Sequence, residues 1–370
     1  MNYLDTINKY RSDDISDHQK NIACWAPFQA MHINKKGRIK PCPFSFPGVE
    51  LKHYQIQWSP KKSLKECWND TVYEEMRNAS FEGSLLKYCK YCIKQCKEDK
   101  PPSSLDYDWV GGPRNISHEY PQEIELELSN KCNYMCDACG PWCSSQWAEK
   151  LGLKDDERFK SNFDNKEYLD AFVKDLKTFI HKIYRINFTG GEPFAQPAVY
   201  SIIKMIEEES ANIHVHFTTN GSVMNGSVKK LVKRPNTSFT VSLDSINRKM
   251  YPKIRVNGNY DNVMNNIDYL IKHCPEVGAS FVITKKNVRE LPDIVNWCNK
   301  KNILFSYHIL ENMGFRNWEK ELQPISVEHE DKNYLAELKH WLISFRPESD
   351  NTEISKKNLQ MYEQYIERLQ

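Results

Sequence analysis

The chain has 370 residues, enough for one large α/β domain and a smaller companion. Its 51 Lys and Arg residues nearly balance 49 Asp and Glu residues, and the charges are interspersed along the sequence. This balance gives no support for nucleic acid as a partner. The sequence shows neither a secretory leader nor an apolar run long enough for a membrane span, so we expect a cytoplasmic protein with no membrane partner.

The first hundred residues are rich in cysteine. They contain six of the twelve cysteines, Cys24, Cys42, Cys67, Cys89, Cys92 and Cys96. In a reducing compartment this density points to metal binding or thiolate chemistry and not to disulfides. Cys24 and Cys42 flank a predicted hairpin with Gly37 in its turn, and Cys89 and Cys92 form a later pair. Four thiolates suffice to close a metal site, and zinc is one candidate for it.

A linker is expected at residues 101–118, because charged, Pro, Ser and Gly residues gather there. After the linker, six β-rich runs alternate with amphipathic helical patterns. The runs are residues 123–127, 185–189, 214–218, 239–243, 279–284 and 303–309. Strands separated by helices pair in parallel. We therefore predict an α/β fold, either a partial TIM-like barrel of six units or an open parallel sheet, with its reactive groups beyond the carboxyl ends of the strands.

Apolar stripes at helical spacing predict four helices between these strands and two in the tail. The four are marked by Leu169, Phe172, Val173 and Leu176; by Val199, Ile202, Ile203 and Ile206; by Val263, Ile267, Leu270 and Ile271; and by Leu291, Ile294, Val295 and Cys298. The tail stripes are Leu335, Leu338, Leu342 and Phe345, then Leu359, Tyr362, Ile366 and Leu369. We expect both tail helices to pack on the core.

The strongest signal is a three-cysteine loop directly after the first of these strands. Residues 129–140 read SNKCNYMCDACG, which places Cys132, Cys136 and Cys139 in a C-x3-C-x2-C spacing. Three thiolates can hold three irons of a cubane 4Fe–4S cluster and leave the fourth iron open. Structural zinc requires four closed ligands. Cys143 is available as a fourth, but the spacing lacks the two separated pairs of a zinc ribbon.

This loop resembles the signature of the radical SAM superfamily, which follows the first strand of a partial (βα)6 barrel. The resemblance continues at the ends of the next three strands and in the segment after the fourth. It covers Gly190, Gly191, Glu192 and Pro193, then Asn220, then Ser242 and Asp244, and finally Arg255. It implies that these residues bind S-adenosylmethionine (SAM), the GGEP motif meeting its amino group and Arg255 its carboxylate. The family's aromatic before the third cysteine is Ala138 here, so Tyr134 and Trp142 are candidates for the adenine contact.

Residues 63–92 resemble the twitch or SPASM auxiliary domain of radical SAM enzymes, including the region of Trp68 and Arg77 and the closing cysteine pair. The resemblance implies a second, auxiliary 4Fe–4S cluster. Its implied ligands are Cys24, Cys42, Cys89 and Cys92. Cys96 is a substitute ligand or the remnant of another site, and zinc remains the alternative metal. This auxiliary domain precedes the barrel, whereas in most relatives it follows.

The resemblance implies an enzyme that reductively cleaves SAM to a 5′-deoxyadenosyl radical, which then abstracts a substrate hydrogen. An auxiliary cluster favours oxidative modification of a peptide, a protein or a small metabolite, with an electron donor such as flavodoxin or ferredoxin. A zinc-stabilised scaffold and an electron-transfer protein that leaves SAM intact stay open as alternatives. His308 and Glu311 lie at or beyond the last strand, but such residues are more often structural, and no catalytic base is assigned.

The expected organisation has four parts. They are an auxiliary domain at 1–100, a linker at 101–118, the radical SAM core at 119–312 and a helical extension at 313–370.

Overall fold

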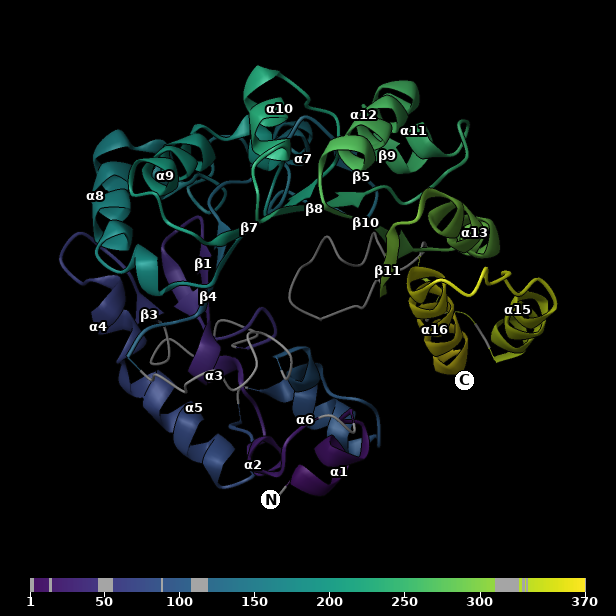
Figure 1. Cartoon of the computed structure of the whole chain (residues 1–370), viewed down its shortest axis with the longest axis horizontal. Helices are drawn as coiled ribbons and strands as arrows, with labels where there is room; N and C mark the ends of the chain where they lie inside the picture. Colours follow the sequence, from purple (N-terminus) through teal and green to yellow (C-terminus); the bar gives the residue numbers. More distant parts are fainter. Residues whose placement is uncertain are drawn as a thin grey trace. The chain divides into compact units, whose positions relative to one another are not determined.

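The computed structural model describes residues 3–12, 15–45, 56–87, 89–107, 119–309, 326–327, 330 and 332–369. The Cα positions divide the chain into two units. Unit 1 comprises residues 1–129, 160–190 and 197–214, and unit 2 comprises residues 130–159, 191–196 and 215–370. Figure 1 labels most of their helices and strands.

Unit 1 contains the cysteine-rich segment and the first two strands expected after the linker. Its helices are α1 (Leu4–Lys9), α2 (Asp17–Lys20), α3 (Ala26–Gln29), α4 (Leu64–Trp68), α5 (Thr71–Phe81), α6 (Lys90–Lys97), the 3-10 helix η2 (Ser103–Tyr107), α8 (Lys166–Lys177) and α9 (Pro197–Glu208). Its strands are β1 (Ala30–Asn34), β2 (Arg38–Lys40), β3 (Ile56–Gln57), β4 (Glu123–Glu127) and β6 (Arg185–Phe188).

The sheet of unit 1 joins the cysteine-rich segment to the first core strand. β4 pairs in parallel with β6 on one side and with β1 on the other, where His32 lies opposite Glu125. β1, β2 and β3 continue the sheet by antiparallel pairing. Along β4 the apolar residues Ile124 and Leu126 are buried, while the alternating glutamates face the other side. α8 and α9 lie side by side (Figure 1).

The predicted hairpin between Cys24 and Cys42 is present as β1 and β2. Gly37 sits in its turn with φ of +75°, a conformation that favours glycine. A Cβ at this position would lie 2.2 Å from the Tyr168 hydroxyl, so the turn also has no room for a side chain. The parallel pairing of β1 with β4 was not predicted from the sequence.

Unit 2 contains the three-cysteine loop and the remaining strands. Its helices are α7 (Ser145–Lys150), the 3-10 helix η5 (Pro193–Ala195), α10 (Gly226–Val232), α11 (Tyr251–Ile254), α12 (Tyr260–His273), α13 (Leu291–Lys301), α15 (Lys332–Ser344) and α16 (Glu353–Arg368). Its strands are β5 (Met135–Cys136), β7 (His214–Thr219, within this unit from residue 215), β8 (Thr237–Ser242), β9 (Arg255–Val256), β10 (Glu276–Ile283) and β11 (Leu304–Ile309).

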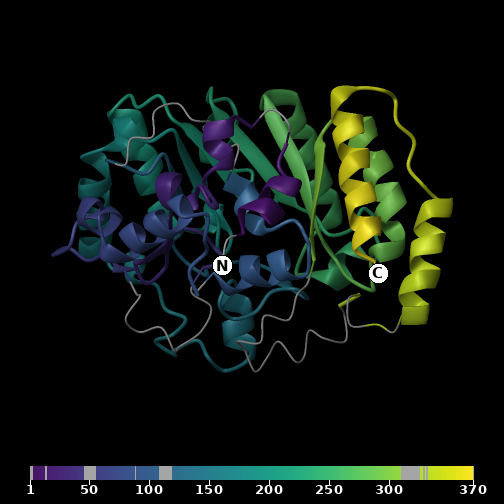
Figure 2. The same cartoon turned by 90° about the horizontal axis from the view of Figure 1, so that it is seen from below.

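The sheet of unit 2 runs β7, β8, β10, β11, and all of its pairings are parallel. α16 lies beside α13 and covers β11 (Figure 2). Asn358 of α16 is fully buried there: its Oδ1 accepts a hydrogen bond from the Phe305 backbone N–H at 2.7 Å, and its Nδ2 donates to the Ile303 carbonyl at 2.9 Å. The helix therefore satisfies backbone groups along β11.

The α/β class with a mostly parallel sheet is confirmed. All six predicted strands and all six predicted helices are present. One residue of the tail stripes is wrong: Phe345 follows the end of α15 and is 56% exposed. Cys67, Cys274 and Cys298 are buried, as expected for small apolar side chains. Residues 108–118 of the expected linker, and Glu311, lie outside the described residues. Within the described part of the chain, no helix is long and apolar enough to cross a membrane.

Candidate functional site

The loop after β4 carries three of the predicted ligands, Cys132, Cys136 and Cys139. The backbone N–H of Cys132 donates to Oγ of Ser145 at 3.2 Å, and that hydroxyl donates back to the Cys132 carbonyl at 3.2 Å. The backbone N–H of Cys139 donates to the Cys136 carbonyl at 3.1 Å, which closes a tight turn between them. Ser145 is the first residue of α7, so the start of this helix anchors the loop.

A two-stranded ladder joins the same loop to the segment of Arg255. β5 and β9 pair antiparallel, with Cys136 opposite Arg255. Next to this pair, the backbone N–H of Asp137 donates to the Ile254 carbonyl at 2.9 Å. Arg255, predicted to meet the SAM carboxylate, is therefore fixed beside the second cysteine and is only 7% exposed.

Asp244 balances the buried charge of Arg255. Oδ2 of Asp244 lies 2.7 Å from Nε of Arg255, although the N–H of Nε does not point at this oxygen. The other carboxylate oxygen of Asp244, Oδ1, accepts a hydrogen bond from the Val282 N–H at 2.7 Å. Asp244 is 1% exposed. Its φ of +61° is unusual for a residue with a side chain, and such outliers concentrate at functional sites. A buried guanidinium needs such a partner, because an unpaired buried charge is costly.

Glu192 of the GGEP motif is fully buried and accepts hydrogen bonds from its own unit. Oε1 accepts from the Thr219 hydroxyl at 2.8 Å and from the Phe194 N–H at 3.2 Å, and Oε2 accepts from the Asn220 N–H at 2.8 Å. Burial raises the pKa of Glu192, and the hydrogen bonds oppose this shift. The carboxylate thus fixes the backbone at the end of β7.

Asn220 extends this network to the three-cysteine loop. Its Nδ2 donates to Oδ1 of Asn133 at 2.9 Å and lies 4.0 Å from Sγ of Cys132. The Nδ2 of Asn133 in turn donates to the Ser222 hydroxyl at 2.9 Å. An amide N–H beside a cluster sulfur is one of the groups that set reduction potentials in iron–sulfur proteins.

The glycines of the motif permit close backbone packing. A Cβ on Gly191 would lie 2.2 Å from the carbonyl oxygen of Lys131, the residue before Cys132. Gly190 has a φ of +98°, which favours glycine. Pro193 begins η5 directly after Glu192. Gly191 is therefore required for contact with the cysteine loop itself.

Ser242 and the two aromatic candidates are also in unit 2, and Tyr134 belongs to the three-cysteine loop itself, where its backbone N–H donates to Sγ of Cys132 at 3.4 Å. Ser242 is the last residue of β8, opposite Ser280 of β10. Tyr134 is 2% exposed. Trp142 packs edge-on against Phe159 at a centroid distance of 4.9 Å.

The pKa values of the three thiols in the loop are not all shifted in the same direction. Burial raises the pKa of Cys132 to about 12. A hydrogen bond with the Cys139 thiol lowers the pKa of Cys136, and the charge of Arg255 lowers it further. The same hydrogen bond raises the pKa of Cys139. Because metal ligation requires thiolates, a metal here must displace protons.

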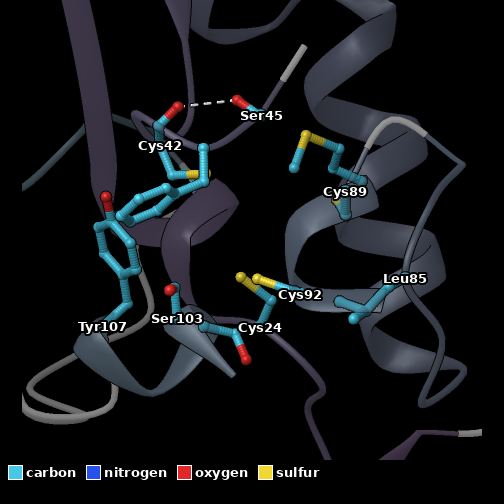
Figure 3. Close-up of a pocket in the computed structure, with 11 residues that line it drawn as sticks. Cys24, Cys42, Ser45, Leu85, Cys89, Cys92, Ser103 and Tyr107 are labelled. Atoms are coloured by element: carbon cyan, nitrogen blue, oxygen red, sulfur yellow. Dashed lines mark hydrogen bonds between the residues drawn. The ribbon is translucent and has the colours of Figure 1, made fainter. Parts of the chain in front are cut away.

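The four N-terminal cysteines predicted as auxiliary ligands line one pocket in unit 1 (Figure 3). Cys24 precedes α3, Cys42 follows β2, and Cys89 and Cys92 belong to the start of α6. Figure 3 shows the thiols of Cys24 and Cys92 pointing toward one another. Tyr107 of η2 contributes to the wall of the pocket. Residues more than sixty positions apart in the sequence are thus brought together around one pocket.

Burial also raises the pKa of each of these four thiols. For Cys24 the neighbouring thiols add to the effect, in the order Cys42, Cys92 and Cys89. The pKa of Cys89 rises to about 12. Cys96 is 6% exposed and packs in the same apolar cluster, but it does not line the pocket.

The described residues contain no group of three His, Cys, Asp or Glu side chains arranged around a single ion. A cubane distributes its ligands over separate irons, so its cysteines surround a larger volume than the ligands of one ion do. The donors of both cysteine sets fit an iron–sulfur cluster, because one loop supplies three thiolates and one pocket is lined by four.

Two sequence models match these two cysteine sets. The model of the radical SAM superfamily matches residues 126–298, and that of the SPASM iron-sulfur cluster-binding domain matches residues 24–93. Residues 126–298 are therefore a radical SAM domain. A radical SAM domain implies a 4Fe–4S cluster and SAM, and a SPASM domain implies auxiliary iron–sulfur clusters. The radical SAM match contains Cys132, Cys136 and Cys139, and the SPASM match contains the four cysteines of the pocket.

The curated relatives align with about half of the chain. The molybdenum cofactor biosynthesis protein moc-5 of Caenorhabditis elegans is 26% identical over 49% of this chain and 28% of its own length. A probable GTP 3′,8-cyclase of Methanocaldococcus jannaschii is 27% identical over 48% of this chain and 55% of its own length. The chain thus spans little more than half the length of the Methanocaldococcus jannaschii relative and less than a third of the length of the Caenorhabditis elegans relative. The crystal structure of Streptococcus suis SuiB bound to S-adenosylmethionine aligns with 85% of this chain and 68% of its own, at 15% identity and a TM-score of 0.45.

Several residues beside the three-cysteine loop were not predicted from the sequence. Asn133 and Ser145 bond to the loop as described above, and the indole N–H of Trp147 donates to the Cys136 carbonyl at 2.8 Å. Asn133 lies in the sequence between two of the predicted ligands, Cys132 and Cys136, which is a usable signal. Ser145 and Trp147 carry no signal, because a serine and a tryptophan at the start of a helix usually cap and pack.

Proposed function

We propose that this protein is a radical SAM enzyme that cleaves SAM reductively and abstracts a hydrogen atom from its substrate. The observation that supports the proposal most is the convergence of Asn220 and Arg255 on the three-cysteine loop. The three-cysteine loop, the GGEP turn, the end of β7 and the segment of Arg255 are joined there by hydrogen bonds and strand pairing. Unrelated surface motifs would not be joined in this way.

Cys132, Cys136 and Cys139 are proposed to hold three irons of a 4Fe–4S cluster. Three thiolates leave one iron without a protein ligand, and SAM requires such a position. When bound, this group supplies one-electron cleavage of SAM to methionine and a 5′-deoxyadenosyl radical. The protein binds and orients SAM and excludes water.

The SAM-binding residues are proposed to divide into contacts and supports. Arg255 and Asn220 are the candidates for contact with SAM, because each stands directly beside a cysteine of the loop. Glu192 and Asp244 are almost fully buried and hold those two residues in place. Gly190, Gly191 and Pro193 shape the GGEP turn, and Ser242 lies at the adjoining strand end.

Cys24, Cys42, Cys89 and Cys92 are proposed to hold an auxiliary 4Fe–4S cluster. Four thiolates around one pocket can ligate every iron. A fully ligated cluster has no position for a substrate, and it fits a role in electron transfer. This favours a net oxidation of the substrate. An electron donor such as flavodoxin or ferredoxin would supply the reducing equivalents.

The proposed substrate is a peptide, a protein or a small metabolite. Similarity to proteins named GTP 3′,8-cyclase makes GTP the small metabolite to examine first. We also propose the four-part organisation with boundaries at residues 1–100, 101–118, 119–312 and 313–370.

Formation of deoxyadenosine tests the proposed activity. Protein reconstituted anaerobically with iron and sulfide should convert SAM to deoxyadenosine and methionine when dithionite is added, and C132A should lose this activity at least a hundredfold. C274A is the matched control, because Cys274 is a buried cysteine outside both sets. Equal turnover by wild type and C132A would refute the proposal. Protein that contains zinc and no iron would indicate a zinc-stabilised scaffold. Protein that holds clusters but leaves SAM intact would indicate an electron-transfer protein.

Addition of GTP separates the substrate classes. If GTP is the substrate, it should accelerate deoxyadenosine formation and be consumed in equal amount. A rate that is unchanged by saturating GTP would leave the peptide or protein class as the one to pursue.

A further inference from the structure

A line of three polar side chains leads from the four-cysteine pocket to the first core strand, entirely within unit 1. Tyr107 lines the pocket and is 7% exposed. Its hydroxyl lies 3.0 Å from Nε2 of His32 on β1. Nδ1 of the same imidazole lies 3.4 Å from Oε1 of Glu125 on β4. None of these residues was singled out by the sequence.

The two strands hold this line in register. His32 is opposite Glu125 in the parallel pair of β1 and β4. The Thr189 hydroxyl also lies 3.4 Å from Oε1 of Glu125, so the carboxylate is held from a second side. The side chain of His32 is 11% exposed and that of Glu125 is 28% exposed. The end at β4 is thus the end nearer to solvent, and the end at Tyr107 is the buried one.

Proton positions along the line follow from the chemistry of its groups. A phenol keeps its proton at neutral pH, and a neutral imidazole has one donor and one acceptor nitrogen. With the Tyr107 hydroxyl donating to Nε2, the N–H of His32 is on Nδ1 and faces the carboxylate of Glu125. The imidazole then has one site left for a proton, at Nε2.

An electron added to the pocket would change which proton positions along this line are favoured. Negative charge favours a nearby cation, and a protonated His32 would stand between that charge and the carboxylate of Glu125. With both ring nitrogens donating, the Nε2–H would bond to the phenol oxygen, and the phenol O–H would be free to turn toward the cysteine sulfurs. The three residues can therefore take up one proton when one electron is added to the pocket.

We propose that Glu125, His32 and Tyr107 form a relay that takes up one proton when the auxiliary cluster accepts one electron. The inference rests on the auxiliary cluster of the proposed function. The electron comes from a one-electron donor, either the substrate radical or an external reductant, and the proton comes from solvent, so that His32 ends with a proton on each ring nitrogen. The three residues are positioning residues, because they act on the cluster through Tyr107.

Other charged groups surround His32. Glu123 on β4 acts on it electrostatically, and Lys40 on β2 is opposite it in the antiparallel pair. Lys40 places a positive charge on the neighbouring strand, whereas Glu123 and Glu125 place negative charges on β4. The residues of α3, which packs on β1, are Ala26, Pro27, Phe28 and Gln29, and none of these titrates.

A redox titration followed by electron paramagnetic resonance (EPR) tests the relay without any substrate. The full chain carrying C132A, C136A and C139A is reconstituted with iron and sulfide, so that only the auxiliary cluster gives a signal. With dithionite as reductant, the midpoint potential should fall as pH rises, by up to about 59 mV for each tenfold fall in proton concentration. H32Q, which keeps a polar side chain but cannot take up the proton, should make the potential independent of pH.

Two further variants separate the relay from a structural role. E125Q should move the pH-dependent range to lower pH, because the imidazolium loses its anionic partner. E127Q is the matched control on the same face of β4 and should keep the wild-type dependence. A pH-independent potential in the unmodified relay, or an unchanged dependence in H32Q, would overturn the relay alone. Failure of the four cysteines to retain iron would overturn the auxiliary cluster as well, and iron analysis before the titration identifies that case.

Discussion

At the scale of single residues, one glycine and seven cysteines shape the two candidate sites. Gly191 allows the GGEP turn to touch the backbone at Lys131. Three of the seven cysteines predicted as ligands are buried and four are half-buried. The pKa of the thiol is raised in six of them and lowered in Cys136. Both features can be tested without knowledge of the substrate.

Replacement of Gly191 should disturb the three-cysteine loop. In G191A the new Cβ would meet the Lys131 carbonyl at 2.2 Å, and the backbone must shift. We expect a loss of about 1–3 kcal/mol in the free energy of unfolding, measured by urea denaturation, together with weaker iron retention by the loop. G226A is the control, because nothing lies within 4 Å of its Cβ position at the start of α10. Equal stability of G191A and G226A would contradict the close packing.

The metal-free protein should become less stable at high pH. Burial raises the pKa of Cys24, Cys42 and Cys92 above their ordinary value of 9.0, so the folded state binds protons that the unfolded chain releases. Their stabilising effect is complete below pH 9 and is lost as pH rises above it, by about 1 kcal/mol per pH unit for each thiol. Urea midpoints between pH 7 and 10, with chelator and reductant present, measure this slope. C24A should reduce the slope, and a flat profile for the wild type would be inconsistent with buried thiols.

At the scale of secondary structure, long periodic segments were predictable and short pairings were not. The six strands and the helices α8, α9, α12 and α13 follow from hydrophobic spacing alone. The ladder of β5 and β9 is only two residues long on each side, and no pattern of that length can be recognised. The parallel pairing of β1 with β4 joins segments about ninety residues apart, and pairing over such a distance depends on tertiary packing.

Asn358 should be important for the attachment of α16 to β11. N358L would leave the Phe305 N–H and the Ile303 carbonyl without their buried partner. We expect a loss of about 2–4 kcal/mol in unfolding free energy, since each unsatisfied buried group costs about 1–3 kcal/mol. Q360L on the exposed side of the same helix should change stability by less than about 0.5 kcal/mol. Similar urea midpoints for the two variants would show that α16 does not cover the strand in this way.

At the scale of the whole molecule, the positions of the predicted ligands can be read from the sequence because they follow local spacing rules. The three-cysteine loop and the GGEP, Asn220 and Arg255 positions are recognisable in this way, and the structure brings Glu192, Asn220 and Arg255 to the loop. The supporting shell was not predictable. Ser145, Trp147, His32 and Glu125 are ordinary residues in the sequence, and only the folded chain shows what they touch.

The central claim is that three cysteines hold a cluster open to SAM while four others hold a closed one. The EPR spectrum of dithionite-reduced protein, recorded before and after addition of SAM, tests it most directly. SAM should change the signal of the wild type and of a variant with Cys24, Cys42, Cys89 and Cys92 replaced by Ala. It should leave unchanged the signal of the variant that lacks Cys132, Cys136 and Cys139. A SAM-dependent change in that last protein, or none in the wild type, would contradict the claim.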